Sequence, residues 1–325
     1  MHVFSSLDQI PTKYGPTVIA IGNFDGVHCG HRWIIDHARS RALALGAKCI
    51  AVTFDPHPVR VLRPDLAPKL ITPMPERLCL LAETGLDATV VLPFTEAFSH
   101  TPAEAFAHDV LHKGLHAVEV HEGDTFRFGY QAQAGIRELA ELGRRFGFTV
   151  AAHHTRTVRG LSVSSSQIRE RIAAGDMTSS RALLGRPFSI RSTPAKGRGI
   201  GSQLTVPTIN LAPYNELLPA NGVYITRMRI GDDANALVFN SVTNAGNRPT
   251  FGEDSFAVES YLFAFQPIEL TEDTPLELTF LKRIREERRF PNPDALKAQI
   301  LRDAAKAQRY FHLESLFSHK AAHES

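Results

Sequence analysis

Short apolar runs alternate with amphipathic stretches along the first half of the chain. Apolar, β-rich runs of strand length lie at 17–21, 49–54, 88–94, 117–120 and 148–153. Helical spacing, with turn or capping residues at the ends, lies at 31–46, 75–84, 101–114, 136–146 and 164–177. Strands that alternate with helices predict a parallel sheet with right-handed crossovers, that is, an α/β domain.

The pattern changes near residues 178–187. From 187 to 281 many Gly, Pro and Asn residues separate short β-rich runs, at 223–230, 236–244, 257–265 and 276–284. Repeated short strands with turn signals predict a compact antiparallel barrel or sandwich. A last amphipathic helix is expected at 293–312. We therefore predict two domains, 1–183 (α/β) and 184–325 (all-β with a terminal helix).

Composition narrows the classes of function. The chain has 325 residues, 43% of them hydrophobic, with 36 basic and 34 acidic residues and a formal net charge of +2. This balance does not favour bulk binding to nucleic acid or to a membrane surface, although anionic small molecules need only local basic clusters. The three cysteines, Cys29, Cys49 and Cys79, have no zinc spacing, which indicates a reducing compartment. We expect no signal peptide, no membrane helix and a cytoplasmic location.

The sequence GNFDGVHCGH follows the first apolar run directly. Glycines at a strand–helix junction let backbone N–H groups approach an anion, and the helix N-terminus adds partial positive charge. The predicted phosphate-binding loop is Gly22, Asn23, Phe24, Asp25 and Gly26. His28 and His31 are three residues apart, so both can donate to phosphate oxygens and stabilise charge in phosphoryl or nucleotidyl transfer. The alternatives are a purely structural corner or a two-histidine metal site.

Serines gather at the start of the helix expected at 164–177. The hydroxyls of Ser164, Ser165 and Ser166 and the nearby backbone amides suit phosphate, and Arg169 can hold it in place. Plain helix capping is the alternative interpretation. In the second half, the glycine-rich KGRGIG (196–201) can surround phosphates through its amides, with Lys196 or Arg198 as a local cation. We therefore assign Lys196, Gly197, Gly199 and Gly201 to phosphate binding.

These motifs, in this order, resemble those of the prokaryotic bifunctional riboflavin kinase/FAD synthetases. The quoted segments are GNFDGVHCGH, TFDPHPVRVLRP (53–64), GDTFRFG (123–129) and VSSSQIRERIAAGDM (163–177), followed by KGRGIG, VPTINL (206–211) and NAGNRPTFG (244–252). The resemblance implies a Rossmann-like HxGH nucleotidylyltransferase domain and a six-stranded antiparallel riboflavin kinase barrel. It further implies phosphorylation of riboflavin to FMN and adenylylation of FMN to FAD, with ATP and Mg²⁺.

The resemblance also implies roles for single residues. Asp55, His57, Phe126, Arg127, Phe128 and Arg285 are implied to contact the flavin. Thr208 and Asn210 are implied to hold Mg²⁺, for which hydroxyl and amide oxygens are suitable ligands. Glu259 is implied to be the catalytic base of the kinase.

Each of these roles has a structural alternative. His57 lies between two prolines and suits a turn, and Phe126 and Phe128 suit a core pair. Glu259 suits a solvent-facing strand position, and Arg285 suits a surface pair with Glu287.

Three other functions remain open. Thr125, Gln167 and the insertion 202–205 depart from the family pattern, so one domain could have lost its activity. A flavin- or nucleotide-binding regulator is a second alternative, against which the lack of a helix-turn-helix or RNA-binding motif counts. An HxGH enzyme for another phosphate-bearing substrate is a third. We expect small-molecule substrates as partners, with neither nucleic acid nor membrane, and the sequence leaves the oligomeric state open.

Overall fold

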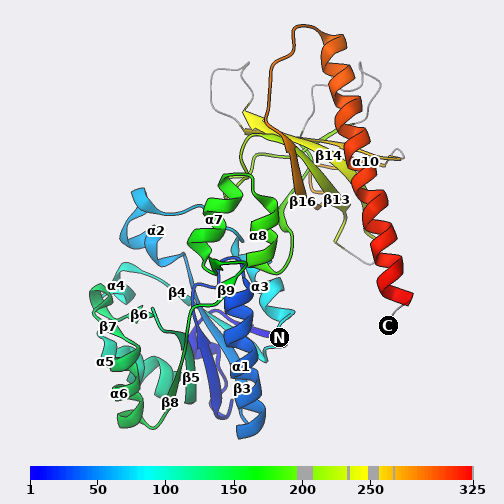
Figure 1. Ribbon diagram of the computed structural model, residues 1–325. Helices are drawn as coiled ribbons and strands as arrows, with labels where there is room; N and C mark the ends of the chain where they lie inside the picture. The colour runs from blue at the N-terminus through cyan, green and yellow to red at the C-terminus, as the bar shows by residue number, and fades with distance from the viewer. Residues whose placement is uncertain (196–207, 233–234, 248–255, 266–267, 324–325) are drawn as a thin grey trace. The chain divides into compact units, whose positions relative to one another are not determined.

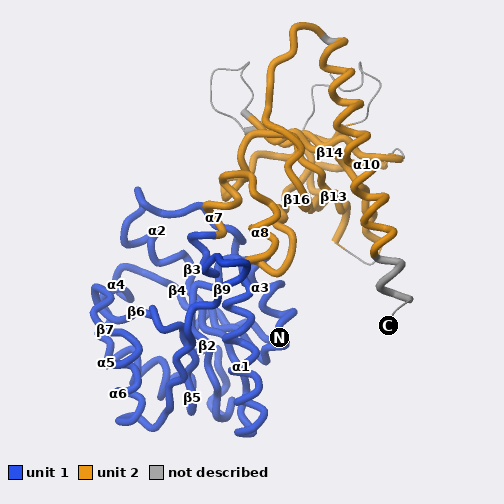
Figure 2. The backbone as a smooth tube through the Cα atoms, viewed as in Figure 1, with its two compact units in different colours: residues 1–167 blue, residues 168–325 orange. Residues whose placement is uncertain are grey.

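The computed structural model describes residues 1–195, 208–232, 235–247, 256–265 and 268–323. The chain divides into two compact units, residues 1–167 and 168–325, shown in blue and orange in Figure 2. Each unit has its own six-stranded sheet.

Unit 1 is built on a parallel sheet with the strand order β1-β4-β3-β2-β5-β8, seen at the lower left of Figure 1. The strands are β1 (His2–Phe4), β2 (Thr17–Ile21), β3 (Lys48–Asp55), β4 (Ala88–Pro93), β5 (Ala117–Gly123) and β8 (Thr149–His153). From β2 the chain first adds β3 and β4 on one side, and then β5 and β8 on the other. The strand order therefore reverses between β2 and β5, which is where open α/β sheets bind ligands, beyond the carboxyl ends of the strands.

Helices cover both faces of this sheet. They are α1 (Cys29–Leu45), α2 (Pro58–Leu62), α3 (Met74–Ala82), α4 (Glu96–Ser99), α5 (Ala103–Ala105), the π-helix η3 (Phe106–Gly114) and α6 (Ile136–Phe146). One face packs on α1 and α3, and the other on η3 and α6. Smaller elements are the ribbons β6 (Arg127–Phe128) with β7 (Ala134–Gly135) and β9 (Thr157–Val158) with β10 (Leu161–Ser162), and the 3₁₀ turns η1 (Leu7–Gln9), η2 (Pro64–Leu66) and η4 (Tyr130–Ala132).

Unit 2 is built on an antiparallel sheet with the strand order β11-β16-β13-β14-β15-β12. Its strands are β11 (Phe188–Ser192), β12 (Thr208–Asn210), β13 (Gly222–Ile230), β14 (Leu237–Asn247), β15 (Phe256–Leu262) and β16 (Leu276–Arg285). A bridge between Pro194 and Leu211 joins the ends of the two edge strands, so the sheet curls toward a barrel. A buried ladder of hydroxyls crosses one face of the sheet, with Thr226 bonded to Ser241 and Thr243, and Thr243 bonded to Ser260.

Three further helices lie in the described part of the chain. Helix α7 (Ser165–Ala173) spans the division between the units, and α8 (Met177–Leu184) follows it. Helix α10 (Pro293–His323) lies along the strands of unit 2 (Figure 1), where Ala307 and Phe311 pack on Val223, Ile225 and Val242.

The predicted fold class is confirmed in both halves, with differences at the ends of elements. The helix expected at 164–177 is wrong in its extent: it ends at Ala173, because Gly175 takes a left-handed φ of 76°, and a second helix, α8, begins at Met177. The single helix expected at 101–114 is α5 continued by the π-helix η3. The last helix extends beyond residue 312 to His323.

Candidate functional site

The segment GNFDGVHCGH forms the corner between β2 and α1, at the point where the strand order reverses. His28 is the N-cap of α1, and its Nδ1 accepts a hydrogen bond of 3.2 Å from the backbone N–H of His31. A neutral imidazole that accepts at Nδ1 carries its proton at Nε2, so Nε2 is the donor that His28 offers to a ligand. The helix start and this donor suit an anion at this corner.

The two histidines of the motif lie face to face. Their ring centroids are 3.5 Å apart with an angle of 14° between the planes, and the ring of Phe24 meets His31 edge-on at 5.1 Å. His28 is buried and His31 is partly exposed. Gly30 leaves room for the imidazole of His28, because a Cβ atom at position 30 would lie only 3.2 Å from that ring. The predicted pairing of His28 and His31 is thus present, while their catalytic role stays a prediction.

The side chain of Asp25 holds the loop in shape. Its carboxylate, 1% exposed, accepts from the backbone N–H groups of Ile71 and Thr72 at 3.1 and 2.9 Å, and it lies 3.6 Å from the guanidinium of Arg77. Gly26 donates its N–H to the Thr72 hydroxyl. If Asp25 helps to bind phosphate, it does so through the loop backbone that it supports. Sequence reasoning did not identify Thr72 and Arg77, which lie 46 or more positions away from Asp25 and Gly26.

Strained backbone marks the same loop. Phe24 and Val27 have positive φ angles of 48° and 37°, and Gly26 has one of 87°. Left-handed geometry at a non-glycine residue costs about 1–3 kcal/mol and persists only where the surroundings enforce it. The contacts of Asp25 with Ile71, Thr72 and Arg77 supply that enforcement.

The serines at the start of α7 have two different contacts. Ser164 accepts from the backbone N–H of Gln167 at 3.2 Å, which is ordinary capping, whereas Ser165 donates to the carbonyl of Asp25 at 2.9 Å. The start of α7 is thereby joined to the histidine loop, which places the two predicted phosphate motifs side by side. Ser166 and Arg169 lie on α7, Arg169 beyond the division between the units, and their roles stay predictions.

The residues predicted to contact the flavin fall into two groups. His57 is the N-cap of α2 and accepts a hydrogen bond of 3.3 Å from the backbone N–H of Val59. Arg127 donates to the backbone carbonyls of Ala132 and Gln133. Both side chains therefore stabilise the local backbone. Asp55 is an exposed residue at the end of β3.

Phe126 and Phe128 belong to a larger aromatic cluster that sequence reasoning did not identify. Their rings stack at 5.5 Å with planes 9° apart. The cluster continues through ring contacts among Phe106, Phe98, Phe94 and Phe54. Phe54 and Phe94 lie at or just beyond the carboxyl ends of β3 and β4, and Phe126 is partly exposed. An aromatic wall at this edge of the sheet suits a planar ring such as a flavin.

The predicted kinase residues of unit 2 meet on neighbouring strands. Asn210 of β12 and Asn244 of β14 both pair with Glu259 of β15. The hydroxyl of Thr208 donates to the Glu259 carboxylate at 2.9 Å. Residues directly opposite each other, or two positions apart on one strand, share a face of the sheet. Thr208, Asn210 and Glu259 therefore form one cluster, and the role of Glu259 as the catalytic base stays a prediction.

These oxygen atoms fit a Mg²⁺ ion. A hydroxyl, an amide and a carboxylate within one cluster are the oxygen ligands that Mg²⁺ takes, and Mg²⁺ usually keeps water and substrate phosphate in its remaining positions. In the described part of the chain there is no group of three or more His, Cys, Asp or Glu side chains with the geometry of a metal site.

Arg285 pairs with a residue outside this cluster. The Arg285 guanidinium donates to Asp303 of α10 at 2.9 Å, and Asp303 is buried, so this arginine ties β16 to α10. Its predicted flavin contact stays a prediction. Lys196, Gly197, Gly199 and Gly201 lie outside the described residues.

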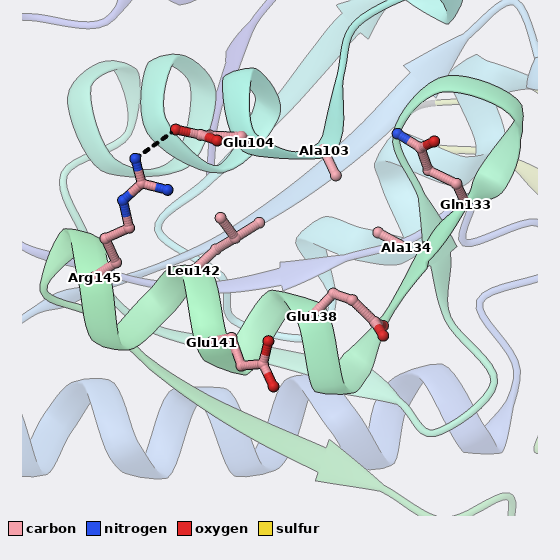
Figure 3. Close-up of a pocket in the computed structure, with 8 residues that line it drawn as sticks. All are labelled: Ala103, Glu104, Gln133, Ala134, Glu138, Glu141, Leu142 and Arg145. Atoms are coloured by element: carbon pink, nitrogen blue, oxygen red, sulfur yellow. Dashed lines mark hydrogen bonds and ion pairs between the residues drawn. The ribbon is translucent and has the colours of Figure 1, made fainter.

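Figure 3 shows an open pocket between α5 and α6 of unit 1. An ion pair of 2.7 Å between Arg145 and Glu104 crosses it, and Glu138 and Glu141 also line it. Three carboxylates beside one arginine disfavour a phosphate. The pocket contains none of the predicted site residues. Separately, no helix within the described residues is long and apolar enough to cross a membrane.

Comparison with known proteins matches a different family to each half of the chain. A family model described as FAD synthetase matches residues 10–167, and one described as riboflavin kinase matches residues 184–311. The chain is 33% identical over 309 residues to the bifunctional riboflavin kinase/FMN adenylyltransferase of Pseudomonas fluorescens, covering 95% of this chain and 97% of the relative. It is 31% identical to the protein of that name from Escherichia coli strain K12, covering 95% and 96% of the two chains.

A crystal structure described as a macrolide-efflux protein from Streptococcus pneumoniae superimposes with a TM-score of 0.83, covering 94% of this chain and 98% of that one. At 24% identity this likeness shows the fold alone. The FAD synthetase model falls within unit 1, and the riboflavin kinase model falls within unit 2. The chain belongs to the bifunctional riboflavin kinase/FMN adenylyltransferase family.

Proposed function

We propose that the two reactions of this family are divided between the two units. Unit 2 phosphorylates riboflavin with ATP to give FMN, and unit 1 transfers AMP from a second ATP to FMN, giving FAD and pyrophosphate. The observation that carries the proposal is that each unit has its own cluster of suitable chemistry, the stacked His28–His31 pair and the Thr208–Glu259 pair.

In unit 1 the reaction needs an oxygen of the FMN phosphate to attack the α-phosphorus of ATP while pyrophosphate leaves. The N-terminus of α1 and His28 Nε2–H are donors grouped at one corner. They would stabilise the negative charge that grows on the phosphoryl oxygens and on the leaving group. Such donors are held in place before the reaction, which is how positioning lowers the barrier without a covalent intermediate.

In unit 2 the 5′-hydroxyl of the ribityl chain attacks the γ-phosphorus of ATP, and ADP leaves. Glu259 accepts the hydroxyl proton, and Thr208 holds the carboxylate through its 2.9 Å hydrogen bond. Thr208 and Asn210 would hold Mg²⁺, which when bound neutralises charge on the phosphates.

The experiment uses the full chain with separate assays for the two half-reactions. Wild type incubated with riboflavin, ATP and Mg²⁺ should give FMN and then FAD by chromatography. His28→Ala should stop FAD formation and leave FMN formation intact. Glu259→Ala should stop FMN formation, while supplied FMN is still adenylylated. Unchanged FAD synthesis in His28→Ala, or equal loss of both activities in either variant, would contradict the division.

The same proposal covers the partners and the place of action. Riboflavin, FMN and ATP are small molecules that fit the two clusters, so we propose that the chain acts on them without a nucleic-acid partner. We also propose a cytoplasmic location, where ATP is available and the three free cysteines stay reduced. Flavin kinase activity in the cytoplasmic fraction of cells that express the chain would support this.

A further inference from the structure

A row of directly paired residues crosses five strands of the unit 2 sheet. Asn210 of β12 pairs with Glu259 of β15, which pairs with Asn244 of β14. Asn244 pairs in turn with Val223 of β13, and Val223 pairs with Arg285 at the end of β16. Directly paired residues share a face of an antiparallel sheet, and Val223 packs on α10. The predicted kinase residues therefore lie on the face of the sheet that carries α10.

The chain after β16 is held against α10. Residues 286–292, here named the strap, join the end of β16 to the start of α10. Nε of Arg285 donates to the buried carboxylate of Asp303 at 2.9 Å, and the amide of Gln299 donates to the same carboxylate at 2.8 Å. Arg288 of the strap donates to Gln299. The guanidinium groups of Arg285 and Arg288 lie 5.6 and 5.0 Å from the ring centre of Phe290. These contacts fix the path of the strap.

One residue of the strap, Glu287, contacts β14. Nδ2 of Asn244 donates to Oε1 of Glu287 at 3.4 Å. Gly246 lies two positions after Asn244 and thus on the same face, and a Cβ atom at position 246 would lie 2.8 Å from the carboxyl carbon of Glu287. Gly246 has no left-handed φ, so the backbone does not require glycine at this position. A glycine inside a strand often marks a close approach, and here the missing side chain leaves room for the Glu287 carboxylate.

The contact with Glu287 sets the orientation of the Asn244 amide. A carboxylate can only accept hydrogen bonds, so the amide must turn its nitrogen toward Glu287. The amide oxygen, Oδ1, then points away from that carboxylate and is an acceptor. Directly opposite residues of an antiparallel pair have Cβ atoms about 4.5–5.5 Å apart, so Asn244 lies beside Glu259. A polyol chain whose terminal hydroxyl meets Glu259 therefore passes within reach of Asn244.

We propose that Asn244 is a substrate-positioning residue of the kinase and that Glu287 positions Asn244. Asn244 Oδ1 accepts a hydrogen bond from a ribityl hydroxyl next to the 5′-hydroxyl, which holds the 5′-oxygen in line for attack on the γ-phosphorus while Glu259 takes its proton. Glu287 does not touch the substrate, and it acts by keeping the Asn244 amide in this orientation. The inference rests on the proposed function of unit 2 and adds two residues to its site.

The test measures riboflavin phosphorylation by the full chain, as the sum of the FMN and FAD formed. Glu287→Ala should lower kcat/KM for riboflavin by about tenfold, the loss of one hydrogen bond, while KM for ATP stays within about twofold of wild type. Glu287→Gln keeps an acceptor for Asn244 Nδ2 and should recover most of that loss. Glu286→Ala is the matched control, because Glu286 is the preceding residue, is 85% exposed and lies 3.9 Å from Arg283. The control should keep wild-type kinetics.

Gly246→Ala tests the same contact from the other side. The added methyl group displaces the Glu287 carboxylate, so this variant should lose about as much activity as Glu287→Ala does. In a chain that already carries Glu287→Ala, the change at Gly246 should cost little further activity, because the carboxylate that it displaces is absent. In the same way, Glu287→Ala should cost little in a chain that carries Asn244→Ala. Losses that simply add in these pairs would overturn the inference.

Two measurements separate loss of positioning from loss of structure. Adenylylation of supplied FMN by the same preparations reports that unit 1 is intact, and a melting curve reports that each variant is folded. If Gly246→Ala does not fold, the pair of Glu287→Ala and Asn244→Ala carries the same expectation. Wild-type kinetics in folded Glu287→Ala overturn the inference and leave the proposed function standing. Absence of FMN formation by wild type overturns the proposed function, and the inference with it.

Discussion

The hydroxyl of Thr208 donates a 2.9 Å hydrogen bond to the carboxylate of Glu259, across the paired strands β12 and β15. A hydrogen bond to a charged group contributes roughly 1.5–3 kcal/mol. The bond fixes the direction in which Glu259 faces an incoming hydroxyl, and it joins the motif PTIN to the glutamate 51 positions away.

Replacing Thr208 by Val should therefore reduce riboflavin phosphorylation by about 10- to 100-fold, which is the loss of one such bond. Val has the shape of Thr without the donor. Thr208→Ser keeps the hydroxyl and should remain within a few fold of wild type. Initial rates of FMN formation measure both variants, and FMN adenylylation by the same preparations is the internal control. Equal rates for Val and Ser would show that the hydroxyl has no part in the reaction.

The buried pair of Asp25 and Arg77 gives a prediction for unit 1. Both side chains are 1% exposed and lie 3.6 Å apart. Asp25→Asn keeps an acceptor for the backbone of Thr72 but removes the charge beside a buried guanidinium, so the free energy of unfolding should fall by about 3–5 kcal/mol. FAD formation should fall as well, because the histidine loop depends on these contacts.

The matched control for Asp25→Asn is Glu141→Gln, which removes one carboxylate from an exposed pair with Arg137 at 3.9 Å. Exposed pairs contribute about 0–1 kcal/mol, so this variant should unfold like wild type. Denaturant unfolding, with unit 1 and unit 2 followed by their separate activities, measures both. A destabilisation by Asp25→Asn no larger than that of the control would show that the pair does not support the loop.

The sequence predicted the fold where a single local pattern decides it. The apolar run 17–21 became β2 with the predicted limits, and Gly46 ends α1 in a left-handed conformation, as a glycine after a helical pattern indicates. Local patterns predicted the ends of helices less well where helical periodicity and a glycine gave opposite indications. Gly175 interrupts the helix expected at 164–177, so that α7 ends at Ala173 and α8 begins at Met177.

The candidate sites were predictable as motifs and only partly as contacts. The pairing of His28 with His31 follows from helical spacing, but the support from Thr72 and Arg77 depends on tertiary packing that spacing does not encode. The same holds for the bond between Ser165 and Asp25, across 140 positions. Sequence reasoning assigned no role to Asn244 or Gly246, because their contact with Glu287 arises only when the segment after β16 lies beside β14.

Gly143 gives a prediction whose sign is opposite to the usual rule. Gly→Ala inside a helix normally stabilises by about 1 kcal/mol, because alanine has the better helix propensity. At Gly143 of α6 a Cβ atom would lie 2.6 Å from the backbone carbonyl oxygen of Phe148 and 3.0 Å from its ring. Gly143→Ala should therefore lower the free energy of unfolding by about 1–3 kcal/mol. A stability equal to or above wild type in denaturant unfolding would contradict this packing.

Glu122, the penultimate residue of β5, gives a prediction for the dependence of stability on pH. Burial raises its pKa well above the ordinary value of 4.5, and the backbone N–H of Gly123 donates a hydrogen bond of 3.1 Å to its carboxyl group. The folded chain therefore keeps this proton at pH values where the unfolded chain has released it. Because the folded state binds more protons, this group makes the free energy of unfolding fall as pH rises above about 4.5.

Glu122→Gln replaces the acid by a neutral amide of the same size, so the fall in the free energy of unfolding with rising pH should disappear. The variant and wild type should melt at similar temperatures near pH 4.5, and the variant should become progressively more stable than wild type as pH rises to 8. The sign is opposite to that for a carboxylate held by an arginine, such as Glu119, whose lowered pKa stabilises the fold above its unfolded pKa. Melting curves across this pH range measure the difference. Parallel curves would show that Glu122 is ionised in the folded chain, and thus that a counter-charge or water reaches the end of β5.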